Sequence, residues 1–217
     1  MKQPSFTLAS PDTISLPLID ASVWYMPELF SHAVAANYFQ QLSSMATIQW
    51  QQTQIKLFGR ECYQPRLTAW YGDDQAEYSY SGLKLKPLSW CPVLLEIKQV
   101  VEQVTSTSFN SVLLNYYRDG ADSMGWHSDN EPELGSHPLI ASVSFGAVRD
   151  FVIRHKHYKT NGLKPVSMAL ASGSCLIMAG TTQQYWQHQV PKRSIKKIPD
   201  GRINLTFRSI IKPSSLR

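Results

Sequence analysis

"GRINLTFRS", residues 201–209, is the stretch that most directly decides the fold, because its side chains alternate between polar and apolar. Side chains two residues apart in an extended strand point to the same face. The polar face carries Arg202, Asn204, Thr206 and Arg208. The apolar face carries Ile203, Leu205 and Phe207. If the apolar face packs on the outer layer of the core, the polar face points into the interior of a barrel.

Two interpretations of the two arginines are open. Inward-pointing arginines cost much free energy unless they meet anions, so they imply a bound dicarboxylate or a pair of acidic side chains. Arginine suits such a site because its planar fork binds a carboxylate through two hydrogen bonds. Alternatively, the strand lies at an edge with its arginines in water. Asn115 and Tyr117 in "LLNYY" share a face in the same way, either to bind that carboxylate or as surface residues.

The second half of the chain has the composition of strands. Its segments are short, rich in β-branched and aromatic residues and separated by turn residues. They are "SVLLNYY" (111–117), "PLIASVSFGA" (138–147), "DFVIRHKHY" (150–158), "SGSCLIMAG" (172–180) and the stretch quoted above. Two helices are predicted before them, from about Glu28 to Ser44 and from Pro92 onwards. This order predicts an α+β, mainly β protein, a sandwich or barrel with helices packed on one side.

One domain covering 1–217 is the simplest organisation, because the chain shows no internal repeat, low-complexity tract or linker. The first 20 or so residues, with three prolines, are predicted to form an extended arm ahead of the first helix. We expect no membrane span and no exported precursor, because there is no run of about 18 apolar residues and no apolar leader. A cytoplasmic location follows as an expectation.

A metal site is suggested by "GWHSDN", residues 125–130. His127 and Asp129 lie two apart, so an extended backbone lets both reach one point while Trp126 and Ser128 face away. His188 in "YWQHQVPKR" is the third candidate ligand. Two histidines and one carboxylate leave open positions on a metal, the arrangement that non-haem Fe(II) oxygenases use.

The spacing alone does not decide for a metal, since a His-x-Asp pair is more often a surface pair and the chain has six histidines. His155 and His157 in "RHKHYK" have similar spacing, and their basic neighbours suggest a solvated or phosphate-facing strand.

Charge and cysteine content add little. The net charge of +5 favours a polyanionic partner only weakly. The cysteines, Cys62, Cys91 and Cys175, are odd in number, far apart and in no CxxC pair, so we expect them to be reduced.

The motifs together resemble the AlkB family of Fe(II) and 2-oxoglutarate-dependent dioxygenases, and most closely its DNA-repair branch. The motifs that carry the resemblance are "NYYRDG" (115–120), "HSD" (127–129), "SVSFGAVRDFVIRHK" (142–156), His188 and "RINLTFR" (202–208). The resemblance covers roughly residues 55–211, and the first 50 residues match only loosely. It implies a double-stranded β-helix, or jelly roll.

The resemblance also implies ligands for Fe(II) and 2-oxoglutarate, with O2 as cosubstrate. Those implied for the iron are His127, Asp129 and His188. Those implied for 2-oxoglutarate are Asn115, Tyr117, Arg202 and Arg208, with Asn204 in the same layer. The implied activity is oxidative demethylation of 1-methyladenine and 3-methylcytosine in DNA, which releases formaldehyde, succinate and CO2.

A nucleotide-recognition lid within residues 51–90, ahead of a core at 91–211, is implied as well. Tyr80 would stack on the flipped base opposite His127, Tyr78 would touch its edge, and Glu131 would lie near its exocyclic amine. Phe58 in "KLFGR" would be a wedge inserted into the duplex. From the residues alone, the two tyrosines fit ordinary strand aromatics better, and Phe58 fits a buried side chain before a turn equally well.

Candidate phosphate contacts, each with a plain solvated role as an equal alternative, are Arg149, Arg154, Lys156, Lys192, Arg193, Lys196 and Lys197. Contacts of this kind would make nucleic-acid binding depend on salt.

Two other functions are carried as alternatives, and a monomer is expected in each case. One is an AlkB-like oxygenase that acts on RNA, protein or a small molecule. The other is a non-catalytic jelly-roll binding module, in which His127 and Asp129 are only polar residues. Asn130 and Pro132 depart from the resembling repair enzymes, which leaves base preference open.

Overall fold

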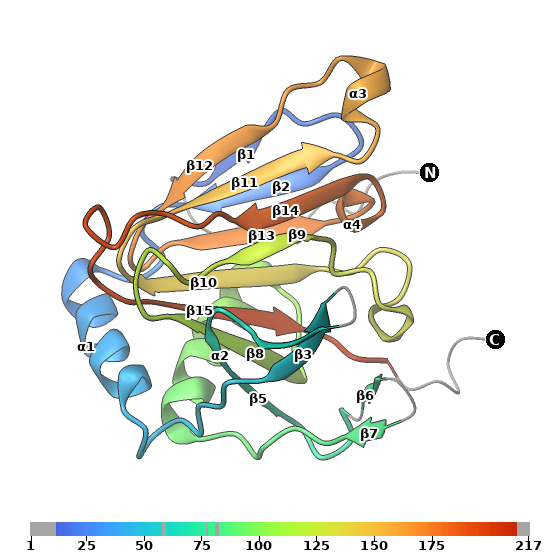
Figure 1. The fold of residues 1–217 in the computed structure, drawn as a ribbon. Helices are drawn as coiled ribbons and strands as arrows, with labels where there is room; N and C mark the ends of the chain where they lie inside the picture. The colour runs from blue at the N-terminus through green and yellow to red at the C-terminus, as the bar shows by residue number, and fades with distance from the viewer. Residues whose placement is uncertain (1–11, 58–59, 77, 81–82, 212–217) are drawn as a thin grey trace.

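Two antiparallel sheets face each other (Figure 1). The computed structural model describes residues 12–57, 60–76, 78–80 and 83–211. Within the segments 55–60 and 77–85 only the backbone is described. The seven-stranded sheet has the order β1 (Ile14–Leu16), β2 (Ser22–Met26), β13 (Cys175–Ala179), β10 (Ile140–Gly146), β15 (Arg202–Arg208), β8 (Ser111–Tyr117) and β5 (Leu67–Gly72). The four-stranded sheet has the order β12 (Val166–Leu170), β11 (Arg149–His155), β14 (Trp186–Val190) and β9 (Met124–His127). The predicted mainly β jelly roll is confirmed.

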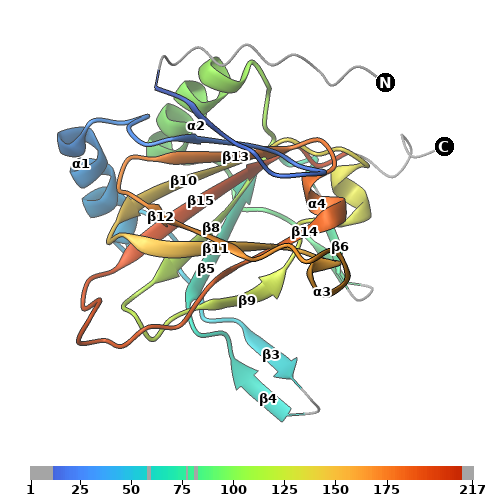
Figure 2. The same ribbon diagram turned by 90° about the horizontal axis from the view of Figure 1, so that it is seen from above.

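Two helices, α1 (His32–Ser43) and α2 (Pro92–Thr105), cover the outer face of the seven-stranded sheet (Figure 2). α1 buries Ala35, Tyr38 and Leu42, which lie on one helical stripe. The helix predicted from about Glu28 begins at His32 instead. The backbone N–H of Phe30 donates to the Gly173 carbonyl, which commits this segment to the loop before β13.

Strand β15 lies in the middle of the large sheet, and its two faces separate as the sequence predicts. Ile203, Leu205 and Phe207 are buried in the core shared with the helices. Burying each such side chain stabilises the fold by about 1.5–3 kcal/mol. Arg202, on the other face, is 1% exposed and lies between the sheets. An edge strand with its arginines in water is therefore ruled out for Arg202.

The segment before α1 contributes two strands to the sheet, which the prediction of an extended arm did not include. β2 pairs with β13 in a register that sets Met26 opposite Cys175, and β1 pairs with β2. Residues 51–90 likewise contribute β5, which pairs with β8. The predicted order of helices first and strands later is therefore wrong for this part of the chain.

Two hairpins and three short helical turns complete the described elements. β3 (Gln54–Leu57) pairs with β4 (Arg60–Tyr63), and this hairpin projects from the body of the molecule (Figure 2). β6 (Tyr78–Tyr80) pairs with β7 (Leu83–Leu85). The short turns are η1 (Pro132–Leu134), α3 (Tyr158–Asn161) and α4 (Thr182–Tyr185). None of the helices in the described ranges is long and apolar enough to cross a membrane.

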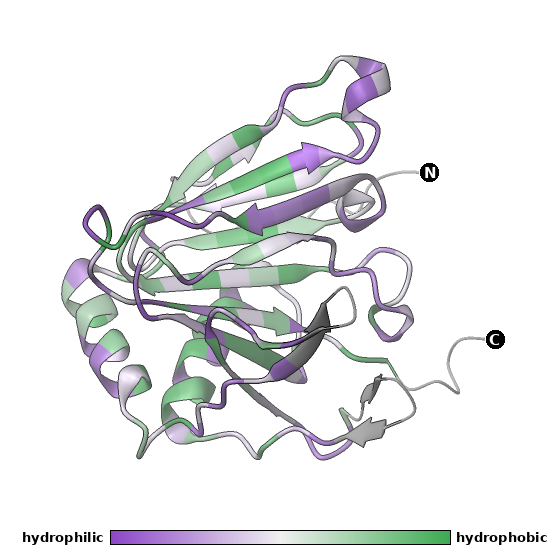
Figure 3. Ribbon diagram, in the orientation of Figure 1, coloured by the Kyte–Doolittle hydropathy of each residue, from purple (hydrophilic) through white to green (hydrophobic). Residues whose placement is uncertain are grey.

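The turn between β10 and β11 depends on Gly146, whose φ is +88°. A side chain there would collide with the Gly201 carbonyl and the Phe39 ring, so only glycine fits. This turn brings the chain from the large sheet to the small one, where the side chains of β11 alternate between buried and partly buried, and its central residues are the hydrophobic ones (Figure 3). β14 beside it, with His188 between two glutamines, is largely hydrophilic.

Candidate functional site

The predicted metal ligands converge at the paired ends of two strands in the small sheet. His127 is the last residue of β9, and His188 lies opposite it on β14. Asp129 follows β9 by two residues. Ligand atoms of His127, Asp129 and His188 all lie within 4.8 Å of one another. The three residues whose role the sequence left ambiguous therefore form a compact three-ligand group.

Hydrogen bonds around the group fix the direction of each ligand. His127 Nδ1 lies 2.9 Å from the Gly125 carbonyl oxygen, which can only accept, so Nδ1 carries the proton and Nε2 keeps its lone pair. The backbone N–H of Asp129 donates to Oε1 of the buried Gln183 at 3.0 Å. Ser128, which was predicted to face away, donates to the Trp186 carbonyl. Gln183 is a positioning residue that no sequence motif indicated.

Electrostatics keep Asp129 and His188 in their metal-binding protonation states. Burial raises the pKa of Asp129, but Arg208, His188 and His127 together outweigh it and the net pKa is lowered. Arg208 Nη2 donates to Asp129 Oδ1 at 2.6 Å. Burial, helped by His127, lowers the pKa of His188 to about 3, so its imidazole is neutral near pH 7. A carboxylate and two neutral imidazoles are suitable donors for Fe(II).

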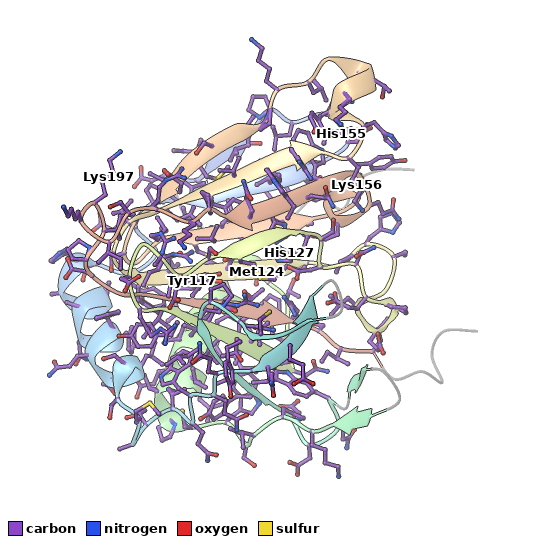
Figure 4. All side chains as sticks on the ribbon, viewed as in Figure 1. Tyr117, Met124, His127, His155, Lys156 and Lys197 are labelled. Carbon is purple, nitrogen blue, oxygen red and sulfur yellow. The ribbon has the colours of Figure 1, made fainter. Side chains whose placement is uncertain are left out.

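A cavity of about 130 Å³ lies between the sheets beside this group and carries the predicted carboxylate-binding residues. Its lining includes Asn115, Tyr117, Arg202, Asn204 and Arg208. Figure 4 shows Tyr117, Met124 and His127 together in the middle of the molecule, away from His155 and Lys156.

Arg202 has the properties of an anion receptor. Its Nη2 donates to Ser144 Oγ at 2.8 Å, whereas Nε and Nη1 are buried without a partner. Burial lowers its pKa to about 10, a value at which the guanidinium remains charged near pH 7. No acidic side chain among the described residues forms an ion pair with it. A buried cation with two free N–H groups fits one carboxylate of a 2-oxo dicarboxylate.

The other predicted members of this layer lie where they were expected, but some are already used within the protein. Asn204 donates to Ser142 Oγ and the Val143 carbonyl. Asn115 Oδ1 accepts from Nε of Arg66, a buried arginine that the sequence interpretation missed. Tyr117 is 2% exposed and packs between two guanidinium groups.

A second cavity, of about 430 Å³, borders the first and shares Glu131, Met124, Leu113 and Arg208 with it. Glu131 therefore lies beside the metal group, as predicted. Its Oε2 is buried without a partner, and burial, with Asp129 nearby, raises its pKa. Oε1 of Gln64, in the same wall, is also buried without a partner. Two unpaired acceptors suit a ligand that carries N–H donors.

The base-recognition predictions stay predictions for three residues. Tyr78 and Tyr80 lie in β6, but their side chains are outside the description. Phe58 lies outside the described residues, between β3 and β4.

One predicted phosphate contact, Arg149, and one predicted solvated or phosphate-facing histidine, His155, are wrong. Arg149 is 1% exposed and donates to three backbone carbonyls. His155 is buried against Tyr185 and Trp186 rather than solvated, although His157 is exposed. Both residues share the inward face of β11 with Phe151 and Ile153, which explains their burial.

The remaining basic residues are at the surface or partly buried. Arg154 lies 4.0 Å from the Trp126 ring centroid, and Lys156 donates to the Gln183 carbonyl. Arg193 pairs with Asp150 at 2.6 Å. Lys192, Lys196 and Lys197 are exposed, and Figure 4 shows Lys197 on the side of the molecule opposite to His155. The three cysteines are free, as expected.

Comparison with known proteins gives a consistent result. The family model of the 2OG-Fe(II) oxygenase superfamily matches residues 22–208. The alpha-ketoglutarate-dependent dioxygenase alkB homolog 3 of Mus musculus is 50% identical over 153 residues, 68% of this chain and 52% of that protein. The DNA oxidative demethylase ALKBH2 of Homo sapiens is 43% identical over 190 residues, 84% of this chain and 71% of that protein.

This chain thus spans about half the length of the homolog 3 proteins that it matches. Among solved structures, OsALKBH1 aligns with a TM-score of 0.57 at 16% identity, over 86% of this chain and 96% of that chain. At this identity the likeness supports the jelly-roll fold alone.

Proposed function

The chain belongs to the AlkB family within the 2OG-Fe(II) oxygenase superfamily, and we propose that it repairs N-alkylated bases in DNA by oxidative demethylation. The proposed substrates are 1-methyladenine and 3-methylcytosine. The observation that carries the proposal is one cavity that joins three metal ligands to a buried arginine with two unpaired N–H groups.

The described residues fit the cofactors of the family. His127, Asp129 and His188 would hold Fe(II), and Arg202, with Tyr117 beside it, would hold 2-oxoglutarate. Bound Fe(II), with 2-oxoglutarate and O2, supplies the oxidation that converts an N-methyl group to N-hydroxymethyl while 2-oxoglutarate becomes succinate and CO2. The N-hydroxymethyl product then loses formaldehyde and leaves the unmodified base. The protein's part is to bind, orient and shield these groups.

The substrate side of the site suits a cationic base. 1-Methyladenine and 3-methylcytosine carry a positive charge and an exocyclic amine, and Glu131 Oε2 and Gln64 Oε1 are unpaired acceptors in the second cavity. The methyl group lies on the pairing edge, so the base must leave the duplex to reach the metal group. The exposed Lys192, Lys196 and Lys197 are suited to contact phosphates.

The direct test is mass spectrometry of an oligonucleotide that carries one 1-methyladenine. Single-stranded and duplex forms are incubated with protein, Fe(II), 2-oxoglutarate and ascorbate, and an RNA of the same sequence runs in parallel. We expect loss of one methyl group from DNA with the wild-type protein and none with His127→Ala. Succinate formation without any DNA demethylation would reject DNA repair and favour the oxygenase alternative on RNA or another substrate. The absence of both metal binding and succinate would favour the binding-module alternative.

The wedge proposal for Phe58 predicts a difference between strand forms. Phe58→Ala should lower the turnover of duplex substrates about tenfold and spare single strands, because a wedge offsets a cost of unstacking of a few kcal/mol that only a duplex has. Initial rates on matched single-stranded and duplex oligonucleotides measure this. Tyr63→Ala, which removes an exposed aromatic at the base of the same hairpin, is the control. Equal losses on both strand forms would reject the wedge.

A further inference from the structure

Arg149 is a buried arginine that reaches neither cavity, and the surface role predicted for it does not exist. It is the first residue of β11 and is 1% exposed. Its Nη1 donates to the Asp119 carbonyl at 2.9 Å, and its Nη2 donates to the carbonyls of Asp122 and Pro191 at 2.8 and 3.0 Å. All three acceptors are neutral, so the positive charge is solvated by backbone dipoles rather than neutralised.

The acidic side chains around Arg149 already accept hydrogen bonds from other donors, and Asp119 Oδ1 accepts from the Ala121 backbone N–H at 2.7 Å. Asp122 accepts from Arg118 Nε and Nη2 at 2.7 and 2.9 Å. Asp150, the next residue on β11, accepts from Arg193. Among the described residues the guanidinium of Arg149 therefore has no ion pair of its own, and the nearby carboxylates of Asp122 and Asp119 act on it only as charges at a distance.

The Tyr117 ring connects Arg149 to the proposed carboxylate site. Arg149 Cζ lies 5.5 Å from the centroid of this ring, and Arg202 Cζ lies 5.4 Å from it. Tyr117 and Arg202 line the cavity beside the metal group, whereas Arg149 does not. The electron-rich ring is thus held by two cations, one that faces the cavity and one behind it.

The two buried cations repel each other, and a bound anion would offset this repulsion. Burial is the largest cause of the lowered pKa of Arg202, and Arg149 lowers it further. A dianion that binds at Arg202 is attracted by both charges in a region of low dielectric. Arg149 therefore favours the ligand-bound state without touching the ligand.

Arg149 also connects two loops, one that follows β8 and one that follows β14. Its three acceptors belong to residues 119–122 and to Pro191, the first residue after β14. The same loops are joined by Arg193 N to the Gly120 carbonyl and by Gly120 N to the Ile198 carbonyl. Because β8 ends at Tyr117, the 119–122 loop continues directly from it and helps to fix the position of the Tyr117 ring.

We propose that Arg149 is a positioning residue that sets the affinity for 2-oxoglutarate, by holding Tyr117 against Arg202 and placing a second positive charge behind the carboxylate site. The inference rests on the proposed use of 2-oxoglutarate at Arg202 and is independent of the nucleic-acid substrate.

The test measures binding without turnover. 2-Oxoglutarate is titrated calorimetrically into Fe(II)-loaded protein under anaerobic conditions, for wild type, Arg149→Met and Arg149→Lys. Arg149→Met should raise the Kd for 2-oxoglutarate about tenfold, the lower end of the effect that supporting residues around a metal site have. Arg149→Lys keeps the charge but replaces two donating nitrogens by one, which cannot reproduce the geometry that reaches all three carbonyls, so a smaller increase is expected. With oxygen present, KM for 2-oxoglutarate should rise in parallel while kcat at saturation stays close to wild type.

Arg118→Met is the matched control, because it frees Asp122 and perturbs the same loop without facing Tyr117. Its Kd should remain that of wild type, and an equal rise in this variant would overturn the inference by assigning the effect to loop structure. If Arg149→Met fails to fold, Arg149→Lys decides, and an unchanged Kd there overturns the inference.

Arg202→Met distinguishes an error in the proposed cosubstrate site from an error in the proposed role of Arg149. If it binds 2-oxoglutarate as tightly as wild type, the proposed cosubstrate site is wrong. If it loses binding while both Arg149 variants keep theirs, only the role of Arg149 is wrong.

Discussion

Replacement of Asp129 by alanine is expected to abolish demethylation while nucleic-acid binding stays close to wild type. The substitution removes the only carboxylate of the metal group and leaves two neutral imidazoles, which hold Fe(II) weakly. It also frees Arg208, so an uncompensated positive charge takes the place of the lost negative charge. Loss of residues that only support metal ligands costs about 10–100-fold, and loss of a ligand should cost more.

The measurement combines three readouts on one preparation: bound iron, demethylation by mass spectrometry and oligonucleotide affinity by fluorescence anisotropy. Asp129→Asn is the matched variant, because it keeps the size of the side chain and an acceptor for Arg208 but removes the charge. We expect both variants to bind the oligonucleotide, since Asp129 is 4% exposed and lies behind the substrate cavity. Near-normal demethylation by Asp129→Ala would remove the metal assignment.

The parts of the site that the sequence could predict are those with a local periodic signal. The alternation in residues 202–208 put Arg202 and Arg208 on one face but left open whether that face lies inside or in water, and the burial of Arg202 decides for the interior. His127 and Asp129 share a face through the same rule, but His188 had to be brought beside them by strand pairing. Six histidines made that choice ambiguous until the family resemblance was considered.

Arg149 shows an error that the same rule would have prevented. Its charge and the basic residues after it suggested a phosphate contact, yet Arg149 lies two residues before Phe151 and four before Ile153, and it shares the buried face of β11 with them. The prediction for Arg149 followed from the charge of the segment and not from its two-residue periodicity. The cost of burying an arginine is then met by backbone carbonyls from loops far along the chain, which no local pattern reveals.

Strand β2 was missed for a different reason. "SVWYM" is rich in β-formers, but prolines upstream indicated an arm, and its partner β13 lies some 150 residues later. Pairing over that distance leaves no local signal. Gln183 is similar, since its contact with Asp129 depends on where α4 begins after β13.

Replacement of Arg202 by methionine is expected to abolish stabilisation of the protein by 2-oxoglutarate without destabilising the ligand-free protein. In the ligand-free state Arg202 is a buried charge with one hydrogen bond, to Ser144, and two unpaired N–H groups. Replacing such a charge by an apolar side chain of similar length is often neutral or stabilising. In the bound state the lost partner of a buried carboxylate should cost about 2–5 kcal/mol, which is about 30-fold or more in Kd.

Thermal unfolding with increasing 2-oxoglutarate measures both halves of this prediction, because a ligand stabilises the folded state in proportion to RT ln(1 + [L]/Kd). Wild type should show a rising Tm, and Arg202→Met a flat curve that starts at or above the wild-type value. Arg154→Met, which removes an arginine stacked on Trp126 at the outer face, should keep the wild-type rise. A lower starting Tm with an intact rise would mean that Arg202 supports the fold, and that the dicarboxylate binds through Arg208 instead. The starting Tm and the rise of Tm with 2-oxoglutarate together distinguish a ligand-binding arginine from a structural one. Loss of a ligand-binding arginine removes the rise and leaves the starting Tm unchanged or higher, whereas loss of a residue that only stabilised the fold would lower the starting Tm.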